Sequence, residues 1–260
     1  MRKILFALYG LLAYVFFFGT FLSAIAFVGN FPMLRGLDAS PSGPLAESLV
    51  IDALLLALFA MQHSVMARPA FKRWWTRVIP AELERSTYVA LASAALALLL
   101  WQWRPLGGEI WSVAGQTAAI VLQVAFWAGW GVVLVSTFLI NHFELFGLRQ
   151  SFAPLLGLGD APPVFRTPGL YRLVRHPIYF GFLLAFWSAP VMTGSHLFFA
   201  LMTSGYVLVG IFLEERDLMH MFGARYAEYR QQVGMLLPRL RPAAQDSFRP
   251  KPAAGKKNAV

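Results

Sequence analysis

Six long apolar runs determine what this chain can fold into. They cover approximately residues 4–29, 47–66, 87–103, 114–140, 178–193 and 197–213. A helix needs about 20 apolar residues to cross the hydrocarbon core of a bilayer, and several of these runs are that long. Of the 260 residues, 58% are hydrophobic and 13% are charged, which is more apolar surface than one soluble core can bury. The sequence therefore predicts an all-α integral membrane protein.

The last two runs are shorter, and they leave two topologies open. Pro190, Gly194 and Ser195 separate them, which predicts a tight hydrophobic hairpin near the C-terminus. Because a helix of about 16 residues is only about 24 Å long, we expect either six transmembrane helices or five with a re-entrant hairpin. From Glu214 to about Val233 the chain is polar but keeps helical spacing, which predicts that the last helix extends into the cytoplasm.

The positions of Lys and Arg predict the orientation of these helices. With the N-terminus inside, all 22 basic residues except Arg35 and Arg104 fall on the cytoplasmic side. The positive-inside rule then places both termini in the cytoplasm, and we expect the membrane to be a bacterial inner membrane. The net charge of +9 is explained by this topology and by anionic lipid, so no nucleic-acid partner is expected. The absence of cysteine excludes disulfides, thiolate metal sites and a Cys nucleophile.

Charges of opposite sign lie at the two ends of the predicted hairpin. The first arm begins with RHPIYFG, and Pro177 is well placed as the first residue of a helix. The free N–H groups there, with Arg175 and His176, could bind a carboxylate or a phosphate, or these residues could only anchor the helix end to lipid headgroups. The second arm ends in EERD, where Glu214 and Glu215 point about 100° apart on a helix.

Two carboxylates at the end of a membrane helix are costly unless they face water, a cation or a partner. Glu214 and Glu215 could therefore simply be solvated beside Arg216. Because a hairpin brings its two ends together, a cationic and an anionic surface would instead lie side by side. A ligand that carries both signs of charge fits such a pair of surfaces.

The segment from about 165 to 240 resembles the isoprenylcysteine carboxyl methyltransferase superfamily. That family has an R-H-P-x-Y-x-G motif, an apolar hairpin, a paired Glu and a G-x-x-Y-x-x-Y element, which here are Arg175 to Gly181, Glu214 with Glu215, and Gly223 to Tyr229. The stretches MQHSVMARPAFKRWW, ERSTYV and INHFELFGLRQ are similar to its NnrU-related branch, and within it to the bacterial methanethiol S-methyltransferases.

The resemblance implies S-adenosylmethionine as cofactor and a small volatile thiol as substrate, methanethiol being methylated to dimethyl sulfide. We expect a division into residues 1–145 on the acceptor side and 146–240 for the cofactor-binding loop, hairpin and cytoplasmic helix. The basic tail at 241–260 is rich in Pro, Ala and Lys, a composition that predicts disorder. The resemblance also implies that the cofactor is bound by the following residues: Tyr171, Arg175, His176, Pro177, Tyr179, Gly181, Glu214, Glu215, Tyr226 and Tyr229.

Four residues are candidates for the chemistry of methyl transfer. His63 and His142 lie at the cytoplasmic ends of the second and fourth apolar runs, and histidine is the natural base near neutral pH. Arg216 could hold a thiolate by its charge, and Glu215 could act as a base or hold the cofactor. Tyr88, Tyr171 and Tyr179 could lie against a sulfonium by cation–π attraction. The sequence does not decide which residue removes the proton.

Two other functions remain open at this point. The chain could methylate a different thiol or a carboxylate. Access for the acceptor would distinguish these cases, because an isoprenoid substrate needs a long lateral tunnel into the lipid and methanethiol does not. It could instead be a haem-binding or redox-associated membrane protein that uses His63, His142 and His176. The spacing of these histidines matches no metal-binding motif, and no metal site is expected.

Overall fold

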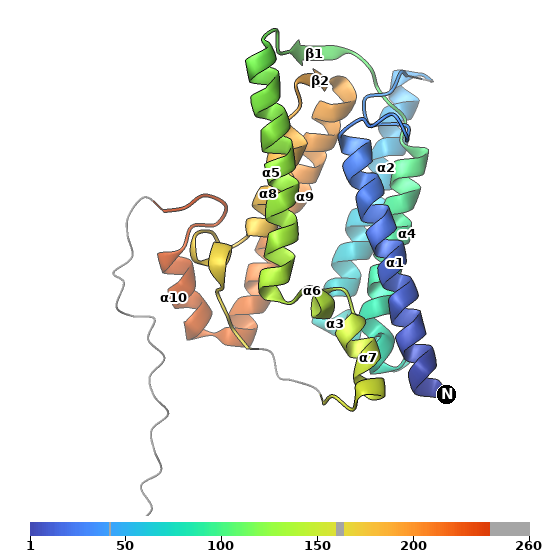
Figure 1. The fold of residues 1–260 in the computed structure, drawn as a ribbon, viewed down its shortest axis with the longest axis vertical. Helices are drawn as coiled ribbons and strands as arrows, with labels where there is room; N and C mark the ends of the chain where they lie inside the picture. The colour runs from blue at the N-terminus through green and yellow to red at the C-terminus, as the bar shows by residue number, and fades with distance from the viewer. Residues whose placement is uncertain (42, 160–163, 240–260) are drawn as a thin grey trace, which may run out of the picture.

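The computed structural model describes residues 1–41, 43–159 and 164–239, which are mainly helical (Figure 1). Within this part of the chain, five helices are long and apolar enough to cross a membrane, so the predicted all-α integral membrane protein is confirmed. The elements in chain order are α1 (Arg2–Val28), α2 (Leu45–Ala67), α3 (Pro69–Trp75), α4 (Ala81–Gln102), β1 (Glu109–Ser112), α5 (Gln116–Ile140), α6 (His142–Leu145), α7 (Leu148–Leu156), the 3-10 helix η1 (Gly169–Arg172), α8 (Pro177–Trp187), β2 (Val191–Thr193), α9 (Gly194–Phe222) and α10 (Ala224–Gln232).

The long helices form two groups that lie side by side. Helices α1, α2 and α4 pack together, and α5, α8 and α9 form the second group (Figure 1). An apolar core that includes Phe27, Trp103, Trp130 and Phe199 joins the two groups, and α2 also contacts α9. Helix α5 packs against α8, and the division expected at residue 145 between an acceptor side and a cofactor side stays a prediction. The tail expected at 241–260 lies outside the described residues.

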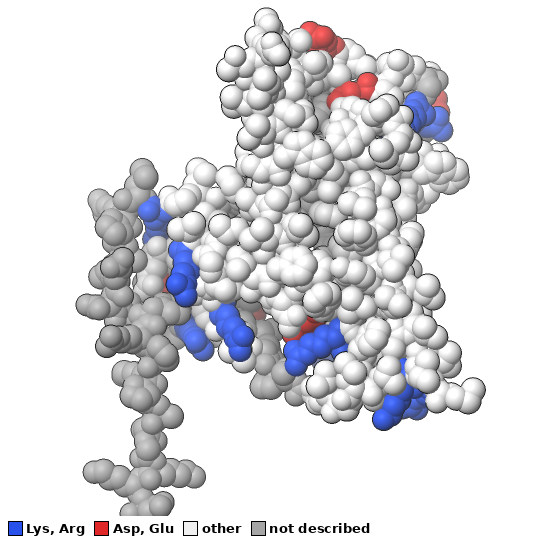
Figure 2. Space-filling model, viewed as in Figure 1, with Lys and Arg blue, Asp and Glu red and all other residues white. Residues whose placement is uncertain are grey.

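The two ends of the bundle differ in charge. The N-terminus, α3, α6 and α7 lie at one end, and β1 and β2 lie at the other (Figure 1). In the face shown in Figure 2, most Lys and Arg side chains gather toward the first end and around α10, whereas acidic side chains predominate at the other end. We call the first the basic end and the second the opposite end.

The predicted hairpin is confirmed, but its first arm is only partly helical. Helix α8 ends at Trp187, and the chain then passes through Pro190 into β2, which pairs antiparallel with β1. The helix expected over 178–193 was therefore too long. Proline lacks an N–H and disfavours helical geometry at the residue before it, so Pro190 prevents α8 from continuing. The extended residues after α8 carry the chain through β2 to Gly194, where α9 begins.

The last helix does not continue to Val233 as expected. Helix α9 ends at Phe222, and Gly223 has φ +53° and ψ −128°, a backbone geometry that is practical only for glycine. Helix α10 then turns aside from the axis of α9 (Figure 1). Its Tyr226 and Tyr229 pack with Phe165, which lies between α7 and η1. The polar extension is thus two helices with a sharp turn between them.

Candidate active site

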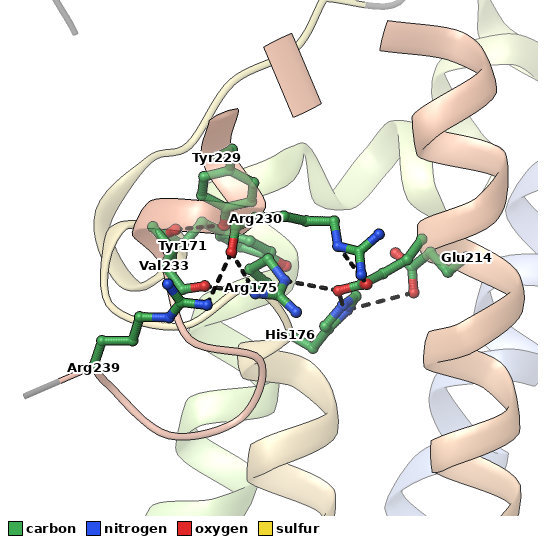
Figure 3. Close-up of polar contacts among 9 residues, drawn as sticks. Tyr171, Arg175, His176, Glu214, Tyr229, Arg230, Val233 and Arg239 are labelled. Carbon is green, nitrogen blue, oxygen red and sulfur yellow. Dashed lines mark hydrogen bonds and ion pairs between the residues drawn. The ribbon is translucent and has the colours of Figure 1, made fainter. Parts of the chain in front are cut away.

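The RHP segment and the paired glutamates meet at the basic end (Figure 3). The buried Glu215 accepts a 2.7 Å hydrogen bond from Nε of Arg175. The same carboxylate lies 3.1 Å from Nε2 of His176 and 3.2 Å from Nε of Arg230. Hydrogen bonds between ionised groups are short and strong. One carboxylate on α9 therefore connects the start of α8 with α10.

Arg175 is surrounded by acceptors from the protein itself. Its Nη1 donates to the carbonyl oxygens of Val233 at 2.6 Å and of Arg230 at 3.2 Å. The backbone N–H of Arg175 donates to the carbonyl of Gly234, and that of His176 donates to the carbonyl of Met235. The structure thus gives Arg175 partners that attach the C-terminal segment to the start of α8.

Glu214 differs from its neighbour, because its side chain is 45% exposed. Its Oε2 lies 3.7 Å from Nδ1 of His176, and its carboxylate lies beside the Tyr179 hydroxyl. Burial raises the pKa of Tyr171, and the charge of Glu214 raises it further, so the Tyr171 phenol remains protonated. An exposed carboxylate with two tyrosines close by is the part of this cluster that is open to a ligand.

Pro177 and Gly181 shape α8. Pro177 is the first residue of α8 with His176 as N-cap, as the sequence predicted. Gly181 lies against α5, where an added Cβ would come within 2.6 Å of the Gly129 carbonyl oxygen. The structure therefore places Gly181 at a helix–helix contact and not among the polar groups around Glu215.

Tyr226 and Tyr229 lie in a buried aromatic cluster with Phe165. The Tyr229 hydroxyl donates a 2.6 Å hydrogen bond to the backbone carbonyl of Tyr171. Burial raises the pKa of both tyrosines, which keeps both hydroxyl groups neutral. These two side chains fix α10 against η1 and the residues before it.

The four residues expected to carry chemistry are not gathered at one place. Glu215 lies at the centre of the polar cluster, whereas Arg216, the next residue, is exposed and has no ion pair among the described residues. His142 contacts the Tyr14 hydroxyl at 2.8 Å and the Thr137 hydroxyl at 2.9 Å, and burial lowers its pKa. The structure therefore places His142 at a contact between α1 and α5, away from Glu215.

His63 lies in a second polar cluster, between α2, α4 and α9. The Tyr88 hydroxyl is 3.1 Å from Nδ1 and 3.0 Å from Nε2 of His63. The ring of Tyr206, from α9, meets the His63 ring edge-on. The three histidines at this end thus have separate partners, and among the described residues no three metal-ligating side chains are grouped as a metal site.

Sequence reasoning missed two residues of these clusters. Arg230 lies one helical turn after Tyr226, a spacing that places both on the same face of α10. Tyr206 lies 11 residues before Asp217, which places those two on one face of α9. Either spacing could have been noticed, but neither shows which neighbouring helix that face contacts.

A cavity of about 440 Å³ lies at the opposite end, far from these clusters. Asn30, Asp38 and His196 contribute to its polar lining. His196 precedes Glu215 by 19 residues on α9, which is about 28 Å along a helix. This cavity is therefore separate from the place where the RHP segment meets the glutamates.

Comparison with known proteins identifies the family. The family model for phospholipid methyltransferases matches residues 124–225. Methanethiol S-methyltransferase 1 of Bradyrhizobium diazoefficiens is 53% identical over 89% of this chain and 81% of its own length. Methanethiol S-methyltransferase of Mycobacterium tuberculosis is 49% identical over 92% of this chain and 98% of its own length.

A more distant relative is Nurim of Rattus norvegicus, which is 32% identical over 81% of this chain and 88% of its own length. No solved structure matches the chain. The resemblance seen in the motifs is confirmed by the bacterial relatives, which are about half identical over almost the whole chain. The chain belongs to the methanethiol S-methyltransferase family.

Proposed function

We propose that this protein transfers a methyl group from S-adenosylmethionine to methanethiol and releases dimethyl sulfide. The relatives about half identical to it bear the name of this activity. The observation that carries the proposal is the meeting of Arg175 and His176 with Glu215 at 2.7 and 3.1 Å. That contact builds a charged site at the open ends of an apolar hairpin, where a donor of mixed charge can meet a small apolar acceptor.

The exposed side of the site suits the cationic part of such a donor. S-adenosylmethionine carries a sulfonium, an ammonium and a carboxylate, and when bound it supplies an electrophilic methyl group. The half-exposed Glu214 carboxylate attracts the positively charged part of the donor. The rings of Tyr171 and Tyr179 can lie against the sulfonium. Glu215 is excluded from this role, because Arg175, His176 and Arg230 already surround it.

Arg230 suits the anionic part of the donor better than Arg175 does. Its side chain is 48% exposed, and the ion pair with Glu215 uses its Nε. The side chain of Arg175 is only 8% exposed and contacts protein acceptors. A guanidinium with exposed terminal nitrogens can bind a carboxylate through two parallel hydrogen bonds. We therefore assign the donor carboxylate to Arg230, with Arg175 as the residue that positions α10.

The apolar surroundings assist the chemistry in two ways. Attack of a thiolate on a sulfonium methyl converts an anion and a cation into two neutral sulfides, so exclusion of water favours the transition state. Holding the two sulfur atoms in line with the methyl group lowers the barrier further, by up to about 7–11 kcal/mol in favourable cases. The ends of α8 and α9 can provide both the dry surface and the fixed geometry.

The distribution of charge also supports an orientation. Lys and Arg gather at the basic end, which carries the N-terminus and α10 (Figure 2). By the positive-inside rule this end faces the cytoplasm, and the membrane would be a bacterial inner membrane. The site would then open to the compartment in which the soluble donor is present.

An isotope experiment tests the proposal. Purified protein is supplied with methanethiol and with S-adenosylmethionine that carries a deuterated methyl group, and the headspace is analysed by gas chromatography with mass detection. We expect dimethyl sulfide that contains one labelled and one unlabelled methyl group. Glu214→Gln should weaken donor binding at least tenfold in calorimetry, whereas Glu228→Gln, at an exposed acid on α10, should leave it unchanged.

Two outcomes would contradict the proposal. A folded protein that does not bind S-adenosylmethionine would overturn the choice of donor. A protein that binds it and produces no labelled dimethyl sulfide would overturn the choice of acceptor.

A further inference from the structure

A second group of polar side chains lies where α2 and α4 of the first helix group meet α9 of the second, about two turns before Glu214 on α9. His63 of α2 contacts the Tyr88 hydroxyl of α4 at 3.0–3.1 Å. Tyr206 of α9 completes the group, since its ring meets that of His63 and its hydroxyl lies 3.2 Å from Oγ of Ser64. Three helices from both groups thus contribute a hydroxyl or an imidazole to one small region.

Positive charge surrounds this region on its basic side. The guanidinium of Arg85 lies 5.0 Å from the centre of the Tyr88 ring. Arg68 lies one turn after Ser64, where its Nε donates to the Ser64 carbonyl and its Nη1 pairs with Asp217 at 2.8 Å. Lys72 interacts electrostatically with Arg85 and Arg68 and also with the carboxylates of Glu84 and Asp217, so three basic side chains and two acidic ones lie on this side. Hydroxyl donors close to several cations favour a bound anion.

Tyr179 connects this region with the site for the methyl donor. Its hydroxyl lies beside Glu214, and it interacts electrostatically with both Tyr206 and Tyr88. An added Cβ at Gly210 would be 3.6 Å from the Tyr179 hydroxyl, which shows that this tyrosine lies against α9 one turn before Glu214. The side chain of Tyr179 is therefore a wall that the two regions share.

We infer that His63, Tyr88 and Tyr206 form the binding site for the acceptor and that this site holds a small thiol as its thiolate. The inference rests on the proposed function and adds the acceptor to it. His63 takes the proton from the thiol S–H, and the Tyr88 and Tyr206 hydroxyls donate to the sulfur. The sulfur electron pair then forms a bond to the donor methyl carbon as the carbon–sulfonium bond breaks. That bonding pair stays on the departing sulfur, and His63 returns its proton to water.

Aromatic rings would limit the size of the acceptor. The His63 ring stacks on Phe59 with ring centres 5.4 Å apart, and Phe59 also meets the Tyr206 ring edge-on. Methanethiol has no remote groups to bind, so selection must come from the exclusion of larger thiols. Tyr206 is the residue expected to set this limit, because its ring faces both Phe59 and His63.

Two variants separate proton removal from size selection. His63→Gln should lower kcat/KM for methanethiol by about 10²–10⁴-fold, the usual effect of losing a general base. Tyr206→Ala should raise kcat/KM for 1-propanethiol relative to methanethiol at least tenfold. Both variants should bind S-adenosylmethionine within twofold of the wild type, which also shows that they are folded. Tyr9→Phe, at an exposed tyrosine on α1, should change none of these values.

The outcomes distinguish this inference from the proposed function. A His63→Gln protein with intact donor binding and a wild-type rate would overturn the role of His63. An unchanged preference in Tyr206→Ala would overturn the acceptor site, even if the first variant failed to fold. A wild-type protein that forms no labelled dimethyl sulfide would instead overturn the proposed function itself.

Discussion

At the scale of single residues, Glu214 and Glu215 show how two adjacent identical side chains acquire different roles. Successive residues on a helix point about 100° apart. Glu215 therefore faces Arg175, His176 and Arg230, whereas Glu214 faces solvent beside Tyr179. One carboxylate stabilises the protein, and the other is available to a ligand.

This difference predicts opposite effects of the same substitution. Glu215→Gln removes the charge that compensates Arg175 in a buried pair, a change that typically costs about 3–5 kcal/mol. We expect a clearly lower melting temperature in detergent for Glu215→Gln and an almost unchanged one for Glu214→Gln. Equal melting temperatures for the two variants would show that the ion pairs around Glu215 contribute little to stability.

At the scale of helices, the contact between α5 and α8 fixes the position of the hairpin. Gly129 and Gly181 face each other, and an added Cβ on either would be 2.6 Å from the carbonyl oxygen of the other. Helices in membranes associate largely through such close contacts between small residues. The glycine of the RHPIYFG motif therefore serves this helix contact.

Gly181→Ala should separate α5 from α8 and destabilise the protein. Overpacking of a tight contact usually costs about 1–3 kcal/mol, so thermal unfolding should occur at a lower temperature. Gly131→Ala is the matched control. Gly131 lies on α5, two residues after Gly129, and an added Cβ there would meet no atom within 4 Å. If both variants melted like the wild type, the α5–α8 contact would not depend on the glycines.

At the scale of the whole molecule, polar contacts hold both ends of the hairpin. Arg175 and His176 contact Glu215 at the basic end. At the opposite end, Asp38 lies 3.0 Å from Nδ1 of His196 and accepts a hydrogen bond from the Thr193 hydroxyl. The loop after α1 is thus attached to the point where β2 joins α9. These contacts keep the hairpin in position within the second helix group.

The contact at the opposite end predicts a dependence of stability on pH. Burial alone would raise the pKa of Asp38, but the hydrogen bond and charge of His196, with bonds from Thr193 and Asn30, hold it below its ordinary value. A carboxyl with a lowered folded-state pKa adds stability above its unfolded pKa of about 3.9, and that stability is lost as the pH falls through the folded value.

Asp38→Asn should therefore melt at a lower temperature than the wild type near pH 6, and the difference should become smaller below about pH 4. Melting curves across this range in detergent provide the measurement. Glu47→Gln, at an exposed acid on α2, is the control and should show no such convergence. A difference that stays constant down to pH 3 would contradict the assigned role of Asp38.

The sequence by itself determined the all-α membrane class, the hairpin and the family, and it narrowed the spanning helices to five or six, because length, hydropathy and motif spacing are properties of contiguous residues. It also indicated that residues near 176 and 215 belong together, since a hairpin must bring its ends close. Only the tertiary structure decided that Glu214 is exposed while Glu215 is enclosed, that Gly181 faces α5, and that His63 meets Tyr88 and Tyr206 while His142 does not. The physical reason is that these roles depend on the rotation of each helix about its axis, which is set by packing between segments distant in the sequence.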